Sequence, residues 1–417
     1  MLLALLLTGS VWFYVEKVMI PQQVAAATAH AAPRGSLSDL YPRWLGAREL
    51  LLHHRDPYSP EVTREIQIGY YGRALDPTHA GDPKDQQAFA YPVYVVFLIA
   101  PTIEFPFPAV QAVFSWLLLV LVMVTVPLWL GAFRWRPPAT GTAILIVLAA
   151  GFFPIVQALK LQQLTLVVCG LIAACVLLLG RGQLLLAGIL LALATIKPQL
   201  VLPLVVWLVL WACSDCRQRR NFLWGFGGTM MLLLGAAQLV LPGWIGSFWA
   251  ALAAYRQYTG RPVSVLATVT APAIGFILAV FVVMTLGIAC WRTRRAGSDA
   301  PAFALISSLV LVTTVVIIPM TALYNQALLL PGVLLLVRNI EFFRSKNLLT
   351  RFASLIAALV FFWPWLAALA LTLDSFVLPP ASVQKAWSAP LWSSMMTPVV
   401  VLLLLGTLTA SVVREQR

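Results

Sequence analysis

Residues 184–212 read LLLAGILLALATIKPQLVLPLVVWLVLWA, an apolar run whose one charged residue is Lys197. An α-helix needs about 20 predominantly apolar residues to cross the hydrocarbon core of a bilayer, and this run exceeds that length. Lys197-Pro198 interrupts the run, because the residue before a proline is disfavoured in the helical conformation. The run therefore predicts a membrane-embedded helical segment that is broken at Lys197.

Similar apolar runs recur at residues 2–20, 89–105, 110–133, 142–158, 164–179, 222–241, 263–291, 302–320, 323–337, 352–373 and 391–413. The composition agrees with them, since 61% of the residues are hydrophobic, 10% are charged and the mean hydropathy is +0.89. A soluble domain has about 25% charged residues. We predict an all-α, polytopic membrane helix bundle with about 11–13 spans, forming one integral membrane domain over residues 1–417.

The basic residues are unevenly distributed. The net charge is +13, yet residues 34–85 hold eight of the fifteen acidic residues and seven bases, and are nearly neutral. The excess of bases lies in short loops, which the positive-inside rule assigns to the cytoplasmic side. This distribution leaves no soluble basic face, so we expect no nucleic-acid partner. The clusters at residues 217–220, 292–295, 338–351 and 414–417 are predicted to be cytoplasmic.

This orientation conflicts with one loop in the first half of the chain. A first membrane helix at residues 1–20 is expected to lead into an extracytoplasmic loop at residues 21–88. Simple alternation of spans would then put Arg134 and Arg136 outside, against the positive-inside rule. One segment must therefore be re-entrant, and residues 184–212 are the candidate because their run is interrupted.

The loop at residues 21–88 is the only long polar segment of the chain. Asp39 is predicted to cap a helix that runs to about His54. Ser59, followed by Pro60, predicts the start of a second short helix. Both helices are expected to lie on the membrane surface, and residues 89–417 are expected to supply the remaining membrane helices.

Three stretches of sequence together resemble a known family: Ser38-Asp39-Leu40-Tyr41 with Arg55-Asp56-Pro57-Tyr58, Phe89-Ala90-Tyr91-Pro92, and Lys160-Leu161-Gln162-Gln163 with Ile196-Lys197-Pro198-Gln199. In order and spacing the chain is similar to glycosyltransferase family 87 of the GT-C superfamily. That family includes polyprenyl-phosphate-mannose-dependent mannosyltransferases and arabinofuranosyltransferases of the cell envelope. The chain departs from the family pattern at Gln162, where glycine is frequent, and at Asn325, where an acidic residue is frequent.

The resemblance implies that the chain is a glycosyltransferase. It would be a hexosyl- or pentosyltransferase that moves a sugar from a polyprenyl-phosphate donor to a lipid or glycan acceptor. The reaction would invert the anomeric carbon, need neither metal nor cofactor, and take place on the extracytoplasmic face of a bacterial inner or plasma membrane. The lipid bilayer, the donor and the acceptor are then the expected partners.

Such a transfer needs a carboxylate that takes the proton of the attacking hydroxyl. GT-C enzymes carry their catalytic acid in the first external loop, so the resemblance implies that Asp39 is the base. The alternative is that Asp39 only caps a helix. Four other carboxylates, those of Asp56, Asp76, Asp82 and Asp85, lie in turn sequences that favour structural roles.

The leaving phosphate needs positive charge or hydrogen-bond donors around it. Lys160 and Lys197 border or interrupt apolar runs, where a charge is costly and usually faces a polar cavity. With Gln163, Gln199 and Arg256, they are the predicted substrate-binding residues. The alternatives are that Lys160 extends to the membrane surface and that Arg256 is a solvated loop residue.

A secondary transporter or a lipid flippase is the alternative function. Transporters often contain internal repeats with paired broken helices. Here one interruption is clear, at Lys197-Pro198, and no repeat matches it. The spacing Cys213-Ser-Asp-Cys216 is a single CxxC, for which a structural interpretation is favoured.

Overall fold

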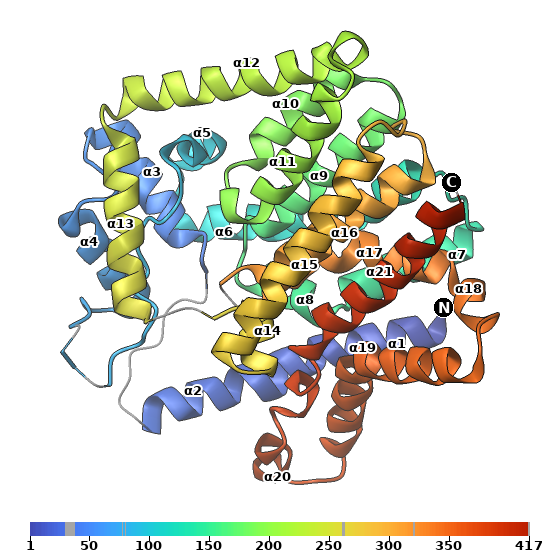
Figure 1. Ribbon diagram of the computed structural model, residues 1–417. Coiled ribbons are helices and arrows are strands. Elements are labelled where there is room, and N and C mark those ends of the chain that lie inside the picture. Colours follow the sequence, from blue (N-terminus) through green and yellow to red (C-terminus); the bar gives the residue numbers. More distant parts are fainter. Residues whose placement is uncertain (30–37, 77, 80, 261–262, 320–321, 416–417) are drawn as a thin grey trace.

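The computed structural model describes all residues except 30–37, 77, 80, 261–262, 320–321 and 416–417. Within the described residues, all regular secondary structure is helical, which confirms the predicted helical bundle (Figure 1). The first helix is longer than expected. It comprises α1 (Leu2–Tyr14), a π-helical turn (Val15–Met19) and α2 (Ile20–Ala29), so the polar loop begins about nine residues later than predicted.

Six described helices are long and apolar enough to cross a membrane: Leu2–Thr28, α6 (Phe107–Ala132), α12 (Cys216–Val240), α15 (Pro272–Thr293), α19 (Leu348–Asp374) and Pro380–Val412, which includes most of α21 (Met396–Glu415). A seventh candidate is the pair α7 (Ala139–Ala150) and α8 (Phe153–Lys160), bent by 59°. The other apolar runs form shorter helices: Val93–Thr102, α9 (Thr165–Gly180), α10 (Leu184–Ala194), α11 (Pro198–Cys213), α16 (Pro301–Ile317) and Leu323–Arg338, which contains α17 (Leu330–Arg338). The estimate of 11–13 spans therefore included runs too short to meet the length criterion alone.

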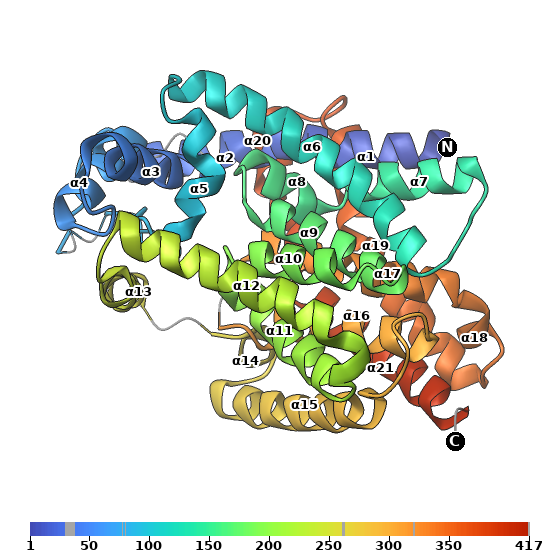
Figure 2. The ribbon, with the colours of Figure 1, turned by 90° about the horizontal axis from the view of Figure 1, so that it is seen from above.

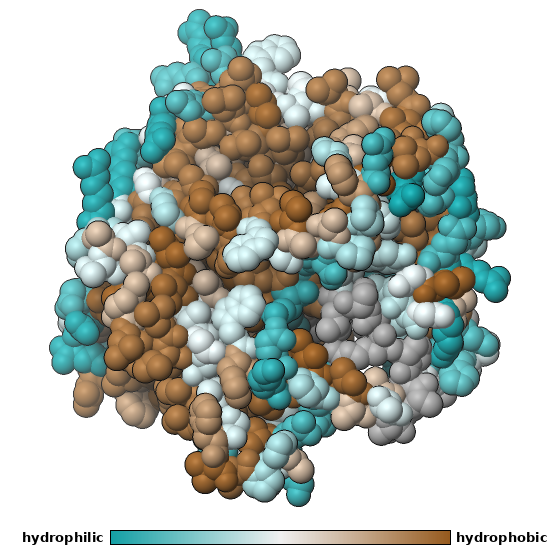
Figure 3. Space-filling model, turned by 180° about the vertical axis from the view of Figure 1, so that it is seen from behind, coloured by the Kyte–Doolittle hydropathy of each residue, from teal (hydrophilic) through white to brown (hydrophobic). Residues whose placement is uncertain are grey.

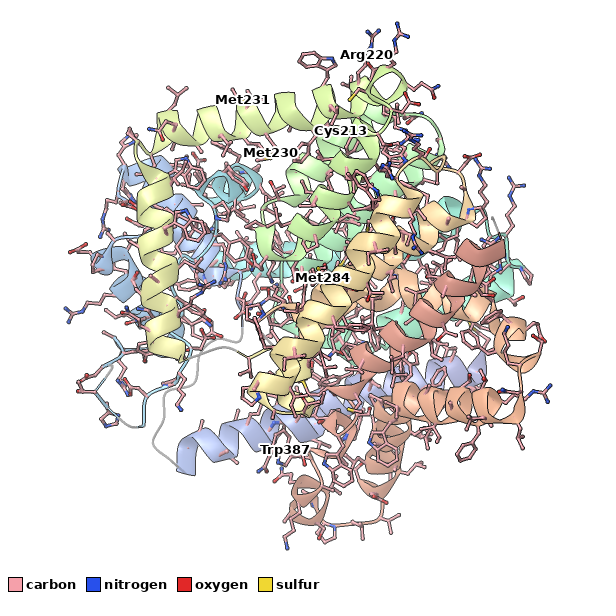
Figure 4. All side chains as sticks on the ribbon, in the orientation of Figure 1. Cys213, Arg220, Met230, Met231, Met284 and Trp387 are labelled. Carbon is pink, nitrogen blue, oxygen red and sulfur yellow. The ribbon has the colours of Figure 1, made fainter. Side chains whose placement is uncertain are left out.

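Arginine-bearing loops meet at one end of the bundle, here called the basic end. Arg134 pairs with Asp299 at 3.6 Å, and Arg338 donates to the carbonyl of Phe133. Arg219 donates to the carbonyl of Arg294 at 3.0 Å. Both termini lie toward this end, and Figure 4 shows Cys213 and Arg220 at the turn between α11 and α12.

The opposite end is formed by α3 (Tyr41–His53), α4 (Pro60–Tyr71) and α13 (Trp244–Thr259), which lie together in both ribbon views (Figures 1 and 2). Apolar side chains cover much of the surface between the two ends (Figure 3). On the opposite face of the molecule, Phe276 and Phe281 of α15 are 70% and 67% exposed. An apolar surface of this extent suits contact with lipid.

Besides residues 184–212, a second segment, residues 89–105, does not cross from one end of the bundle to the other. Trp44 of α3 donates to the carbonyl of Thr102 at 3.2 Å, and the ring of Phe89 lies 5.3 Å from that of Tyr58. Both ends of the 89–105 run thus lie beside the polar loop, so this run does not lead to the basic end. If residues 89–105 are not counted as a span, the alternation of spans between the two sides of the membrane puts Arg134 at the basic end, as the positive-inside rule requires.

Residues 184–212 form two helices, α10 and α11, with the break at Lys197 as predicted. The pair leads from the basic end to Lys197 and back, since Ser214 donates to the carbonyl of Arg294 at 2.6 Å. Helix α10 packs closely on α12. A Cβ at Gly188 would lie 2.3 Å from the carbonyl oxygen of Phe222, and one at Gly225 would lie 2.2 Å from that of Leu185. Small residues permit this approach of two backbones.

The two predicted helix starts differ in outcome. The prediction for α4 is confirmed, because the Ser59 hydroxyl accepts from the Val62 amide at 3.2 Å. The prediction for α3 is wrong, because Leu40 holds the N-cap position and no side chain caps the helix. The Asp39 carboxylate accepts a hydrogen bond from a distant glutamine instead, so capping does not explain this aspartate.

Candidate active site

A polar pocket of about 90 Å³ lies between α3, α13 and the break between α10 and α11. It is called the Asp39 pocket here. Its polar lining residues are Asp39, Arg43, Asp85, Gln87, Tyr91, Lys197, Gln199, Tyr255 and Tyr324. The structure therefore brings together residues that lie far apart in the sequence, including two carboxylates and two cations.

The Asp39 carboxylate is held by two amides. Gln163 Nε2 donates to Asp39 Oδ2, and Gln87 Nε2 lies 3.5 Å from Asp39 Oδ1. Burial raises the pKa of this carboxyl above its ordinary value, and the nearby charge of Asp85 raises it further. The charges of Arg43 and Lys197 oppose that shift. A raised pKa makes Asp39 a stronger base than an ordinary aspartate once it is ionised.

Lys197 connects to Asp39 through Gln163. Its ammonium donates to Gln163 Oε1 at 3.0 Å and to the Thr165 hydroxyl at 2.7 Å, and the residue is only 3% exposed. The ring of Tyr324 lies 4.7 Å from the same ammonium. The break in the helical run thus puts a buried cation at the pocket wall, where a charge has polar and aromatic neighbours.

Arg43 is a pocket residue that sequence reasoning did not select. Its Nη1 donates to the Asp39 carbonyl at 2.7 Å, and its guanidinium lies 4.4 Å from the Tyr91 ring centroid. Its buried Nε has no partner among the described residues. A buried donor without a partner is costly, so a bound anion would suit this position. The spacing from Asp39, one helical turn, was the available signal.

Asp85 also belongs to the pocket, although its turn sequence had favoured a structural role. It accepts from Gln87 Nε2 at 2.7 Å and from the Tyr255 hydroxyl at 3.3 Å. Gln87 has φ of 48°, a left-handed conformation that is uncommon for residues other than glycine. Such conformations concentrate at functional sites, where the surrounding contacts hold them in place.

The other rival carboxylates lie outside the Asp39 pocket. Asp82 pairs with Arg73, and that hydrogen bond lowers the pKa of Asp82 to about 2. Asp76 accepts from the amide and the hydroxyl of Thr78, at 2.9 and 2.7 Å. Asp56 accepts from the Tyr58 amide at 2.8 Å. These contacts support the structural roles expected for the three residues.

Two of the predicted binding residues are separate from the Asp39 pocket. Lys160 pairs with Glu16, and its ammonium lies 5.0 Å from the Trp12 ring. Arg256 is exposed on α13 and is not part of the pocket lining. Gln163, Lys197 and Gln199 remain, two of them lining the pocket and Gln163 joining Lys197 to Asp39.

Asn325 lies behind Lys197 and is 1% exposed. Its Oδ1 accepts from the Thr165 hydroxyl at 3.4 Å, while its Nδ2 has no partner among the described residues. Lys197 is thus linked through the Thr165 hydroxyl to the neutral amide of Asn325 and not to a carboxylate. The positive charge of Lys197 is left available to the pocket.

Gln162 occupies a position that favours glycine, since its φ is 52°. Its side chain accepts from the Ser38 hydroxyl and donates to the Gln111 carbonyl and, at 2.9 Å, to the Ser115 hydroxyl. These bonds fix the segment that carries Asp39 and Gln163. Glutamine is thus accommodated at a position where glycine is frequent in the family, because its side chain makes the hydrogen bonds that hold its own left-handed backbone.

This arrangement predicts an unusual order of stabilities at position 162. Gln162→Ala should lose the three side-chain bonds and keep the left-handed conformation, whereas Gln162→Gly should lose the bonds and relieve the strain. The glycine variant should therefore be the more stable by about 1 kcal/mol. Thermal unfolding of both variants in the same detergent measures the difference. An alanine variant that is as stable as the glycine variant would contradict the strain.

The fold and the pocket define a multi-pass membrane protein with a carboxylate and cations gathered at one end. The sequence model of glycosyltransferase family 87 matches residues 89–319, and the chain belongs to this family. It is therefore a membrane glycosyltransferase, which favours the expected transferase over the transporter alternative. Comparison with the curated proteins and with the solved structures gave no match. The matched range includes Gln163 and Lys197 and excludes Asp39 and Arg43.

Proposed function

We propose that the chain transfers a sugar from a polyprenyl-phosphate donor to a lipid or glycan acceptor, with inversion at the anomeric carbon. Asp39 acts as the general base, and Arg43 and Lys197 hold the donor phosphate. The observation that carries this proposal is the Asp39 pocket itself. It puts a carboxylate of raised pKa opposite two cations, in a protein that belongs to a membrane glycosyltransferase family.

The chemistry balances with these groups alone. The acceptor oxygen attacks the anomeric carbon while the bond from that carbon to the phosphate oxygen breaks. The acceptor proton passes to the Asp39 carboxylate, and the electron pair leaves with the polyprenyl phosphate. Arg43 and Lys197 stabilise the negative charge that grows on the phosphate. Because the phosphate leaves as an anion, no acid is needed to protonate it, and the proposed mechanism uses neither a metal nor a cofactor.

The lipid part of the donor is supported by the position of the pocket. Its lining residues come from the polar loop and from the break between two apolar helices, α10 and α11. A phosphate at that depth can stay attached to a lipid tail in the bilayer. A nucleotide-sugar donor would bring a second phosphate. The described lining has only two cations, Arg43 and Lys197, and Asp39 and Asp85 partly balance their charge, so the pocket suits a donor with one phosphate.

A panel of donors tests the proposal. The purified protein in nanodiscs is incubated with polyprenyl-phosphate mannose, glucose or arabinofuranose, or with nucleotide sugars, and with a membrane lipid extract as acceptor. Mass spectrometry of the lipid products then reports transfer. We expect one polyprenyl-phosphate sugar to give a product one sugar heavier, and the nucleotide sugars to give none. Transfer from a nucleotide sugar alone would contradict the proposal.

The face of the membrane is a separate prediction. We expect the α4 end to be extracytoplasmic and the basic end to be cytoplasmic. Glu61 is exposed on α4, and the native Cys213 and Cys216 are exposed at the basic end. In intact cells, a membrane-impermeant thiol reagent should label Glu61→Cys in a background where both native cysteines are serine. The native pair should react only after lysis. The reverse pattern would overturn the orientation.

The pH dependence should report the charges around Asp39. Transfer requires the ionised carboxylate, so kcat/KM should fall as the pH drops through a pKa above the ordinary value of about 3.9. Arg43 lowers that pKa, so Arg43→Gln should move the acidic limb to higher pH. Asp85 raises it, so Asp85→Asn should move the limb to lower pH. Shifts in the same direction would exclude Asp39 as the titrating base.

A further inference from the structure

A second cavity, of about 580 Å³, lies beside the Asp39 pocket and is called the side cavity here. We propose that it binds the saccharide part of the acceptor, an inference that rests on the proposed function. Ala88 lines both spaces. Asp85 and Gln87 line the pocket, while Gln86 lines the side cavity. The two spaces therefore adjoin at this short segment.

Helix α13 forms part of the wall of both spaces. Leu252 and Tyr255 line the Asp39 pocket, whereas Ala251, Ala254 and Tyr258 line the side cavity. A ligand in the side cavity thus lies under the same helix as the proposed base. Ala88, which lines both spaces, has a small side chain, so the acceptor hydroxyl would enter the Asp39 pocket beside it.

The side cavity has the lining of a sugar site. The hydroxyl of Tyr58 donates to the Tyr91 carbonyl at 2.6 Å, and that of Tyr258 donates to the Pro83 carbonyl at 3.0 Å. Because both hydroxyls are anchored, the two rings are held in place as apolar surfaces. The C–H faces of a sugar ring pack on such surfaces. The Thr63 hydroxyl adds a donor and acceptor for sugar hydroxyls.

Charge and size distinguish the side cavity, proposed for the acceptor saccharide, from the Asp39 pocket, proposed for the donor phosphate. The side cavity has one cation, Arg64, and one anion, Asp76, so its lining favours a neutral polar ligand over a phosphate. Its volume of about 580 Å³ compares with about 90 Å³ for the Asp39 pocket. The pocket has room for reacting groups, whereas the side cavity has room for sugar rings. An acyl chain would instead require an apolar lining, which Arg64 and Asp76 interrupt.

Two neighbouring alanines provide a matched pair of variants. Ala254 lines the side cavity, and Ala253 is exposed on the same helix outside both linings. Ala254→Trp should fill the cavity, while Ala253→Trp should add the same ring to the surface. Thr63→Tyr fills the cavity from α4 and provides a second variant with independent effects on folding.

The probes are di- and trisaccharides of mannose, glucose and arabinofuranose, each added separately to the full chain in nanodiscs. Saturation-transfer NMR detects binding. We expect at least one probe to bind the wild type and Ala253→Trp, and the binding to be lost in Ala254→Trp and Thr63→Tyr. Absence of binding to the wild type, or binding that survives both cavity variants, would overturn the inference. No donor is present, so this outcome is independent of the donor panel that tests the proposed function.

Discussion

Asp39→Asn is expected to reduce sugar transfer by about 10²–10⁴-fold, the usual contribution of a general base. Asparagine keeps the size of the side chain and an oxygen that can accept from Gln163. It removes the negative charge and the site that takes the proton. Since the side chain does not cap α3, the change should leave that helix intact. Initial rates with saturating donor, together with thermal unfolding of each variant, measure the two effects separately.

Asp82→Asn is the matched control for this prediction. Asp82 lies in the same polar loop and pairs with Arg73, outside the lining of the Asp39 pocket. Its replacement should leave turnover close to that of the wild type. An Asp39→Asn variant that keeps more than about a tenth of wild-type turnover would rule out the base role. Asp85, which shares the Gln87 amide with Asp39, would then be the next carboxylate to test.

Lys197→Met is expected to weaken donor binding by about 10–100-fold. A hydrogen bond to a charged group contributes about 1.5–3 kcal/mol, and 1.4 kcal/mol corresponds to a tenfold change in affinity. Methionine fills the space of the lysine stem and removes the ammonium. Titration of the enzyme in nanodiscs with polyprenyl-phosphate sugar measures the change.

Lys160→Met provides the control, because the sequence predicted both lysines as substrate-binding residues. Lys160 pairs with Glu16 away from the Asp39 pocket, so its replacement should leave donor affinity unchanged. Equal affinities for the wild type and Lys197→Met, at normal protein yield, would assign Lys197 a structural role. A loss with Lys160→Met alone would reverse the assignment that the structure favours.

The main features of the fold follow from hydropathy and proline. The apolar runs predicted a helical membrane bundle, and Pro198 predicted the break at Lys197. Hydropathy could not distinguish residues 89–105 from a span, because an apolar segment beside a polar loop has the same composition as a short crossing helix. The hydrogen bond from Trp44 to Thr102 marks the difference, and its partners lie 58 residues apart.

The pocket was only partly predictable for a similar reason. Asp39 and Lys197 could be selected from local context and from the family resemblance. Arg43 was missed because its spacing from Asp39 was the only local signal, and its contact with the Tyr91 ring forms only in the folded chain. Lys160 was also predicted to bind substrate, but it lies outside the Asp39 pocket, where it pairs with Glu16, 144 residues away in the sequence. Sequence spacing gives no information on contacts of that range.

The most direct test of direct displacement in the Asp39 pocket is the configuration of the anomeric carbon in the product. A polyprenyl-phosphate sugar labelled with ¹³C at that carbon is supplied to the wild-type enzyme with the acceptor found by the donor panel, and NMR follows the label. We predict that one product signal appears, with the anomeric configuration opposite to that of the donor. A product with retained configuration, or a donor that stays unconsumed, would contradict direct displacement at the Asp39 pocket.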